Sequence, residues 1–158
     1  MATATTDHDV FIMAIGMEQI GKDFYEALSL GSNDAKVRDF CLRAANEEAA
    51  HLAAFKQMYK QYANSALASR TSPETAAALA SLAKGCIQPD PLAVRKVAIG
   101  GHLNDALAMA LQMEHDSIHF YRSLLAQLPQ FAQAIAKIVE EEQRHLTRLQ
   151  SLARPIGH

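Results

Sequence analysis

Glu48-Ala49-Ala50-His51 and Glu142-Gln143-Arg144-His145 repeat one pattern, a glutamate followed three residues later by a histidine. Residues three apart lie on one face of an α-helix, so each stretch can present a carboxylate and an imidazole together. Each pair also lies within a series of apolar residues spaced by three and four, which is typical of a helix face turned toward a core. Both pairs are therefore predicted to lie inside the protein.

A second glutamate precedes each pair and extends the repeat. Glu18 is followed by Phe24-Tyr25 and lies thirty residues before Glu48. Glu114 is followed by Phe120-Tyr121 and lies twenty-eight residues before Glu142. The chain is thus predicted to contain two copies of one unit, a helix with a single glutamate and then a helix with the Glu-x-x-His pair.

Alanine, leucine, glutamate and glutamine predominate between glycine and proline breaks, which predicts four long helices near 8–30, 34–64, 102–127 and 130–153. If two antiparallel helices carry their glutamates at one level, the turn between them lies midway between those glutamates. The midpoints are residue 33, inside Gly31-Ser32-Asn33-Asp34, and residue 128, next to Pro129. Both fall on turn signals, so each repeat is predicted to be a helical hairpin.

The segment 65–101 is predicted to cross over between the second and third helices without becoming a fifth core helix. The midpoint of their glutamates is near residue 81, far from a tight turn. Ser72 can cap a short helix that begins at Pro73 and ends at Gly85, and a second short turn can begin at Asp90-Pro91. The predicted fold is an all-α four-helix bundle running up, down, down and up, with this long crossover.

Composition limits the class of protein further. The 158 residues are 49% hydrophobic and 20% charged, with a net charge of -2, which predicts one folded domain over 1–158. The near-neutral charge argues against nucleic acid or an anionic membrane as a partner. No apolar run reaches 18 residues, and 10–15 is too short for a signal peptide, so a cytoplasmic location is expected.

Two cysteines without a C-x-x-C pair make a disulfide framework or a thiolate metal site improbable, and Cys41 is interpreted as a small buried apolar residue. Glu47, Glu140 and Glu141 are assigned to solvated helix faces. The same assignment is made for His115 and His119, which are four residues apart but lack a third ligand.

Four buried carboxylates and two imidazoles are too costly to leave uncompensated, because like charges at close range repel and burial removes their hydration. Two divalent cations would balance the four negative charges. Mixed carboxylate and imidazole ligands suit iron or manganese, and bundles with this set of ligands are known to hold two metal ions. The predicted metal ligands are Glu18, Glu48, His51, Glu114, Glu142 and His145.

On these residues the chain resembles the ferritin-like superfamily, and within it the rubrerythrin group. The resemblance rests on Glu18 with Phe24-Tyr25, on the run from Asp105 to Glu114 with Phe120-Tyr121, and on the two Glu-x-x-His pairs. It implies two iron ions, with manganese, a mixed pair or zinc as alternatives. The bridging carboxylates would include either Glu48 and Glu142 or Glu18 and Glu114. Tyr25 and Tyr121 would act from outside the ligand set, by hydrogen bonds to second-shell carboxylates; the alternative is that they are core tyrosines.

Two departures from typical rubrerythrins affect what the resemblance implies. A rubredoxin-like region with two C-x-x-C pairs is not found in the sequence, so electrons are expected from a separate rubredoxin-like protein or flavoprotein. Rubrerythrins usually have a further glutamate where Ser117 stands, and its counterpart in the first repeat is Gly21. The ligand set thus resembles the four-glutamate, two-histidine set of bacterioferritins. These two small residues either leave room for oxygen, peroxide or water, or allow close helix packing.

The leading hypothesis is a di-metal oxidoreductase, a rubrerythrin-like peroxidase or ferroxidase that reduces peroxide or oxidises Fe(II) with oxygen or peroxide. The alternatives are an iron-binding or iron-handling module without turnover, and a di-iron hydroxylase of an organic substrate, which would need a deep apolar pocket at the metals. By resemblance the protein is expected to be a homodimer.

Overall fold

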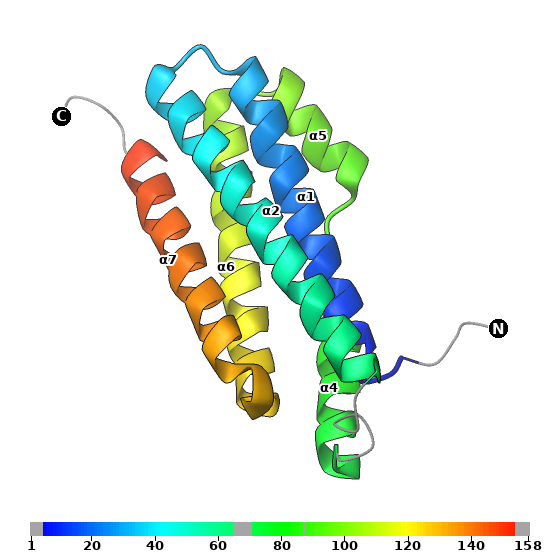
Figure 1. Ribbon diagram of the computed structural model, residues 1–158. Helices are drawn as coiled ribbons and strands as arrows, with labels where there is room; N and C mark the ends of the chain where they lie inside the picture. The colour runs from blue at the N-terminus through cyan, green and yellow to red at the C-terminus, as the bar shows by residue number, and fades with distance from the viewer. Residues whose placement is uncertain (1–4, 65–70, 87, 154–158) are drawn as a thin grey trace.

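Four long helices form a bundle in the computed structural model, which describes residues 5–64, 71–86 and 88–153 (Figure 1). They are α1 (Asp9–Gly31), α2 (Ala35–Asn64), α6 (Leu103–Gln127) and α7 (Ala132–Ala153). In Figure 1, α1 runs upward, α2 and α6 run downward and α7 runs upward. The predicted all-α bundle and its up-down-down-up order are confirmed.

The two hairpin turns lie where the sequence predicts them. After α1, Asp34 accepts hydrogen bonds at Oδ1 from the backbone N–H groups of Lys36 (2.9 Å) and Val37 (3.2 Å), and so caps the start of α2. α6 gives way at Leu128 to a 3₁₀ turn, η1 (Pro129–Phe131), that leads directly into α7. Each repeat is therefore a helical hairpin with its turn at the midpoint between the glutamates.

The crossover contains two helices, α4 (Pro73–Gly85) and α5 (Pro91–Gly100). As predicted, Ser72 caps α4, with its Oγ accepting from the N–H of Thr75 at 3.1 Å. Asp90 caps α5 in the same way, with its Oδ1 accepting from the N–H of Leu92 at 3.1 Å. The first part of the expected crossover, 65–70, lies outside the described residues.

The crossover contributes more to the core than the sequence suggested. Where a short turn was expected at Asp90, the structure has a ten-residue helix that packs along α1. α4 contacts both α1 and α6. Each of the two helices buries an apolar pair four residues apart, Leu79 with Ala83 and Val94 with Ala98, because residues at that spacing share one helix face.

The core consists of two apolar clusters with a polar layer between them. The first includes Phe11, Phe55 and Ile135, and the second includes Phe24, Phe40, Leu107 and Leu149. Cys41 belongs to the second cluster and is fully buried, which confirms its interpretation as a small apolar residue. Burial raises the pKa of this thiol to about 12.

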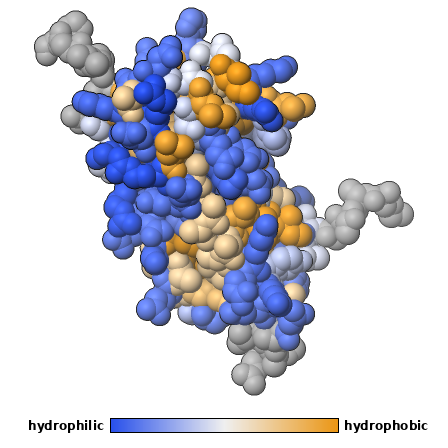
Figure 2. All heavy atoms as spheres, turned by 45° about the horizontal axis from the view of Figure 1, so that its top comes forward, coloured by the Kyte–Doolittle hydropathy of each residue, from blue (hydrophilic) through white to orange (hydrophobic). Residues whose placement is uncertain are grey.

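On the face that Figure 2 shows, hydrophilic residues surround a group of hydrophobic residues near the top and a paler apolar band through the middle. Among the described residues, none of the helices combines the length and the apolar character that crossing a bilayer requires.

Candidate metal centre

All six predicted metal ligands meet in the polar layer between the two apolar clusters. Each is at most 4% exposed, and together they come from all four long helices. α1 and α6 each supply one glutamate, whereas α2 and α7 each supply a glutamate and a histidine. The positions follow from the sequence, because each of these residues lies on the inward stripe of its helix.

In the first half of the site, three carboxylates converge on one nitrogen of His51. Its Nδ1 lies 3.3 Å from Oε2 of Glu48, 3.3 Å from Oε1 of Glu142 and 3.5 Å from Oε2 of Glu18. One N–H cannot donate well to three oxygens at once. The four ligand atoms lie within 4.8 Å of one another, a spacing suited to holding one cation between them.

The second half repeats this arrangement around His145. Its Nδ1 lies 3.1 Å from Oε2 of Glu142, 3.3 Å from Oε1 of Glu114 and 3.5 Å from Oε1 of Glu48. These four residues also offer ligand atoms that lie within 4.8 Å of one another. The two halves of the site thus match the two repeats of the sequence.

Glu48 and Glu142 belong to both halves, and each places one carboxylate oxygen in each half. Glu18 and Glu114 each belong to one half. Of the two pairs that the sequence left open for the bridging role, this geometry favours Glu48 and Glu142.

Two buried tyrosines donate hydrogen bonds to Glu18 and Glu114, the glutamates that belong to one half of the site each. The hydroxyl of Tyr121 donates to Oε1 of Glu18 at 2.6 Å, and the hydroxyl of Tyr25 donates to Oε1 of Glu114. The sequence predicted hydrogen bonds to carboxylates outside the ligand set, whereas each tyrosine contacts a predicted metal ligand, the single glutamate of the other repeat. Burial, reinforced by the nearby carboxylates, raises the pKa of both phenols well above its usual value, so both remain hydrogen-bond donors.

Glu47 and Glu141 were assigned to solvated faces: Glu47 is exposed as predicted, Glu141 is half-buried, and the carboxylate of each contacts a site histidine, which was not predicted. Oε2 of Glu141 lies 2.6 Å from Nε2 of His51, and Oε2 of Glu47 contacts Nε2 of His145. The side chain of Glu141 is 20% exposed and that of Glu47 is 47% exposed. Each therefore contacts both a buried imidazole and the solvent. The doubled glutamate in both repeats, Glu47-Glu48 and Glu141-Glu142, is the sequence signal that marks them. Glu140 is 73% exposed, as predicted.

When a cation displaces the proton of Nδ1, a carboxylate that accepts a hydrogen bond from the Nε2–H group keeps the lone pair of Nδ1 directed at the centre of the site, as in most histidine metal ligands. Glu47 and Glu141 therefore orient the two imidazoles. Because each belongs to the other repeat's Glu-x-x-His helix, α2 and α7 orient each other's histidine.

Burial and mutual repulsion favour the protonated form of the clustered glutamates. Burial, together with neighbouring glutamates, raises the pKa of Glu18 and Glu48, and raises that of Glu114 to about 8. Burial lowers the pKa of His51 and His145, but the surrounding carboxylates outweigh this effect and raise both. The imidazoles, protonated, thus supply positive charge to the cluster.

One buried oxygen of the site lacks a well-formed hydrogen bond within the described part of the chain. Oε2 of Glu18 is buried, and among the described residues it lacks a hydrogen-bond partner; Nδ1 of His51 approaches it to 3.5 Å. A buried carboxylate oxygen without a partner costs stability unless a cation binds it. The orphaned oxygen and the set of four carboxylates with two imidazoles therefore fit a pair of divalent cations.

The two small residues beside the site differ in their surroundings. A methyl group added at Gly21 would lie 3.5 Å from Oε1 of Glu48, which is an ordinary van der Waals contact. Ser117 is half-buried, and His115 and His119 are exposed, which confirms the assignment of the two histidines to a solvated face.

A cavity of about 920 Å³ lies between α4 and α6, with Met17, Met113 and Cys86 in its wall. Met17 and Met113 directly precede Glu18 and Glu114 in the sequence, but the wall includes none of the six site residues.

Comparison with known proteins identifies the architecture. No family model and no curated protein matches the chain. A solved structure does match, that of a Thermotoga maritima protein provisionally described as a ferritin-like diiron-carboxylate protein. It superposes with a TM-score of 0.72 at 21% identity, over 99% of this chain and 100% of the other. The chain therefore has the ferritin-like fold.

Proposed function

We propose that the chain binds two iron ions in its six-residue site and uses them as an oxidoreductase, reducing hydrogen peroxide or oxidising Fe(II). In this proposal it acts as a rubrerythrin-like peroxidase or ferroxidase supplied by a separate electron donor. The main support is the placement of Glu48 and Glu142, each of which extends one oxygen into each half of the site. Shared carboxylates of this kind suit two cations held side by side.

Each half of the site would hold one cation with one imidazole nitrogen and three carboxylate groups. His51 and Glu18 would complete the first half, and His145 and Glu114 the second. Such a ligand set suits iron and manganese better than a structural zinc ion. An iron pair supplies two electrons, one from each Fe(II), which is the number that hydrogen peroxide needs, with two protons, to become two waters.

The chain's own residues would hold the site in shape during this exchange. Tyr121 and Tyr25 each hold one oxygen of a terminal glutamate by a hydrogen bond. At Glu18 this bond occupies Oε1 and leaves the orphaned Oε2 to face the cation. The two apolar clusters above and below exclude bulk water from the ligands.

The test is a single-turnover experiment. Metal-free protein is loaded anaerobically with Fe(II), its iron content is measured, and it is mixed rapidly with hydrogen peroxide or with oxygen. We expect about two iron ions per chain, consistent with a two-metal bundle site, and oxidation well above the rate in buffer. Glu48→Gln removes the charge of a shared carboxylate and should lower both values. Glu140→Gln, at an exposed neighbour, is the matched control. Oxidation no faster than in buffer would contradict the proposal.

The same experiment separates the alternatives. An iron-storage assembly would retain many iron ions per chain and elute as a large particle, whereas a small enzyme would hold about two ions. Turnover of an organic substrate has less structural support, because the wall of the 920 Å³ cavity does not include the site residues. Size measurement on the same sample would also test the proposed homodimer.

A further inference from the structure

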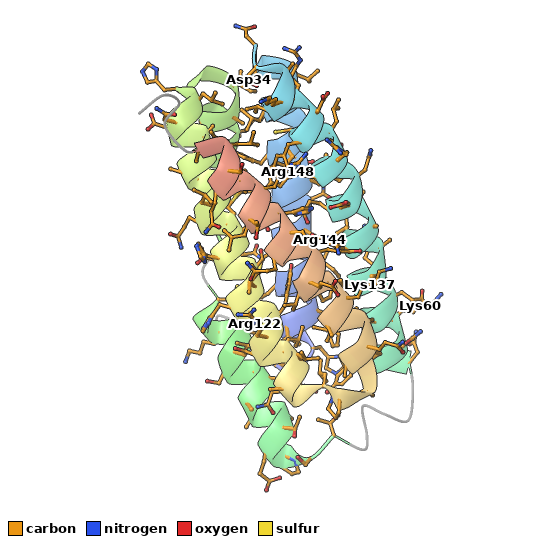
Figure 3. All side chains as sticks on the ribbon, turned by 90° about the vertical axis from the view of Figure 1, so that its left-hand side faces the viewer. Asp34, Lys60, Arg122, Lys137, Arg144 and Arg148 are labelled. Carbon is orange, nitrogen blue, oxygen red and sulfur yellow. The ribbon has the colours of Figure 1, made fainter. Side chains whose placement is uncertain are left out.

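A groove of about 710 Å³ runs between α6 and α7 on the outside of the bundle. Three arginines line it, Arg122 from α6 and Arg144 and Arg148 from α7, and Glu140 is the acidic residue among its lining residues. Figure 3 looks onto this face, with Arg144 and Arg148 along α7 and Arg122 on the neighbouring helix. The groove therefore carries a formal charge of +2, in a chain whose net charge is -2.

Much of this positive charge is not neutralised by the protein itself. Arg144 shares its charge with Glu140 at 3.4 Å and Glu141 at 3.7 Å. Arg122 and Arg148 are exposed, and in the described part of the chain neither has an ion pair with an acidic side chain. Exposed guanidinium groups that have no acidic partner within the protein can bind carboxylates of another molecule through two parallel hydrogen bonds.

The groove is also connected to the buried site. Nη2 of Arg144 lies 3.7 Å from Oε1 of Glu141, whose Oε2 lies 2.6 Å from Nε2 of His51. Nδ1 of His51 then contacts the shared carboxylates of the site. Arg144 and Arg148 also lie on α7, the helix that carries Glu142 and His145. A helix is roughly 10 Å across, so a protein seated in the groove would lie close to the predicted metal ligands.

We infer that the arginine groove between α6 and α7 is the docking surface for an acidic electron-donor protein. This inference rests on the proposed redox function, in which two Fe(III) ions return to Fe(II) by accepting one electron from each of two donor molecules, which are themselves oxidised. Charge complementarity at the rim of such a contact mainly speeds association and makes it sensitive to salt.

The first test measures binding without any redox step. Protein loaded with zinc is titrated with an acidic rubredoxin by calorimetry, at 20 mM and at 300 mM NaCl. We expect binding at low salt that Arg122→Glu/Arg148→Glu weakens by about tenfold or more, and a much smaller difference at high salt. The matched control is Arg95→Glu/Lys96→Glu, which makes the same change in net charge at exposed positions of α5 and should bind almost as wild type does.

A second test measures the electron transfer itself. The oxidised iron-loaded protein is mixed with reduced rubredoxin or with reduced methyl viologen, a small cationic reductant that needs no protein surface. Arg122→Glu/Arg148→Glu should slow reduction by rubredoxin about tenfold at low salt and leave reduction by methyl viologen without such a loss.

Absence of salt-dependent binding by the wild-type protein, or equal loss in both double variants, would overturn the inference. Tighter binding of a short duplex DNA than of rubredoxin would also overturn it, because the groove would then be a general anion surface. Failure of the proposed function looks different: the protein would not oxidise Fe(II), yet rubredoxin binding would still depend on Arg122 and Arg148.

Discussion

The two histidines of the site depend on glutamates that lie outside the ligand set. Glu141 contacts Nε2 of His51, and Glu47 contacts Nε2 of His145. Because Nδ1 of each histidine also contacts carboxylates of the site, each imidazole is fixed at both nitrogens. Partners of this kind set the orientation of a metal ligand and strengthen its lone pair, and their loss typically weakens metal binding by about ten- to hundredfold.

We expect Glu47→Gln and Glu141→Gln each to lower the affinity for Mn(II) or Fe(II) by about tenfold or more. A glutamine offers a weaker acceptor to Nε2, so the imidazole is less firmly held. Competition with a chelator of known affinity measures the effect. Glu140→Gln is the control, because Glu140 is 73% exposed and pairs with Arg144 instead of a histidine. Unchanged affinity in both variants would mean that these contacts do not support the site.

Gly21 offers a test of the two explanations for the small residues beside the site. We expect Gly21→Ala to stabilise the protein by about 0.5–1 kcal/mol, because alanine favours the helix and its methyl group fits at 3.5 Å from Glu48. Iron oxidation should stay within a factor of about two, since an ordinary contact need not move the carboxylate. Thermal unfolding and the single-turnover assay measure the two quantities. A large loss of oxidation rate in a stabilised protein would show that the space beside Glu48 is used by the reaction.

The six clustered residues could be predicted from the sequence, but Glu47 and Glu141 could not be assigned to their histidines. The ligands share one helix face, and the spacing of three within each pair fixes that face without knowledge of the neighbours. Glu47 and Glu141 each precede a ligand by one residue, so each lies roughly 100° around the helix from it. The sequence pattern predicts that this side of the helix is exposed to solvent. Their contacts depend on how closely α2 and α7 approach, which is a property of the packed bundle.

Among the elements, α4 and α5 distinguish this bundle from four helices alone. Both pack against α1, and both also contact α6. The side chain of Leu79 is completely buried, within the apolar cluster that also contains Phe55 and Phe120. The crossover is therefore part of the hydrophobic core and contributes to the stability of the whole bundle.

We expect Leu79→Ala to destabilise the protein by about 2–5 kcal/mol, the usual cost of an alanine in place of a buried leucine. Leu92→Ala is the matched control, since the side chain of Leu92 on α5 is 69% exposed and should cost less than about 0.5 kcal/mol. Chemical denaturation of metal-free protein measures both values. Equal small effects would mean that α4 is not tightly packed in solution.

The turns and caps of these elements follow from local sequence, whereas the length of α5 does not. Ser72 and Pro73 mark the start of α4 by a side-chain cap and a fixed backbone angle, which act within one turn of helix. In α5, Val94 and Ile99 have low helix propensity, and a ten-residue helix is marginal by itself. Its packing along α1 stabilises it, and that packing cannot be read from the segment itself.

At the scale of the whole molecule, the polar layer is both the candidate metal site and the least stable part of the core. Two apolar clusters stabilise the two ends of the bundle, but the layer between them collects four carboxyl groups in a buried space. Without metal, the cluster is tolerable because protons occupy it. Metal binding and proton binding therefore compete for the same residues, and the stability of the protein should depend on both.

The direction of that dependence follows from the pKa shifts. Burial and neighbouring glutamates raise the pKa of Glu18, Glu48 and Glu114, in the last case from 4.5 to about 8. The carboxylates around His51 and His145 raise their pKa above the usual 6.5. For all five groups, the folded state keeps a proton that the unfolded state releases as the pH rises. Their contribution to stability is thus complete below the unfolded pKa and is lost as the pH rises toward the folded pKa.

We therefore expect the Tm of the metal-free protein to fall by about 5 °C or more between pH 5.5 and pH 8, since one retained proton is worth about 1.4 kcal/mol per pH unit. With excess Mn(II) the gap between the metal-loaded and metal-free Tm should widen over the same range, because the cation displaces fewer protons at higher pH. Calorimetry with and without EDTA measures both. The double variant Glu18→Gln/Glu114→Gln should flatten the metal-free slope, because glutamine does not titrate. A metal-free Tm that rises toward pH 8 would contradict the assignment of these protons to the buried cluster.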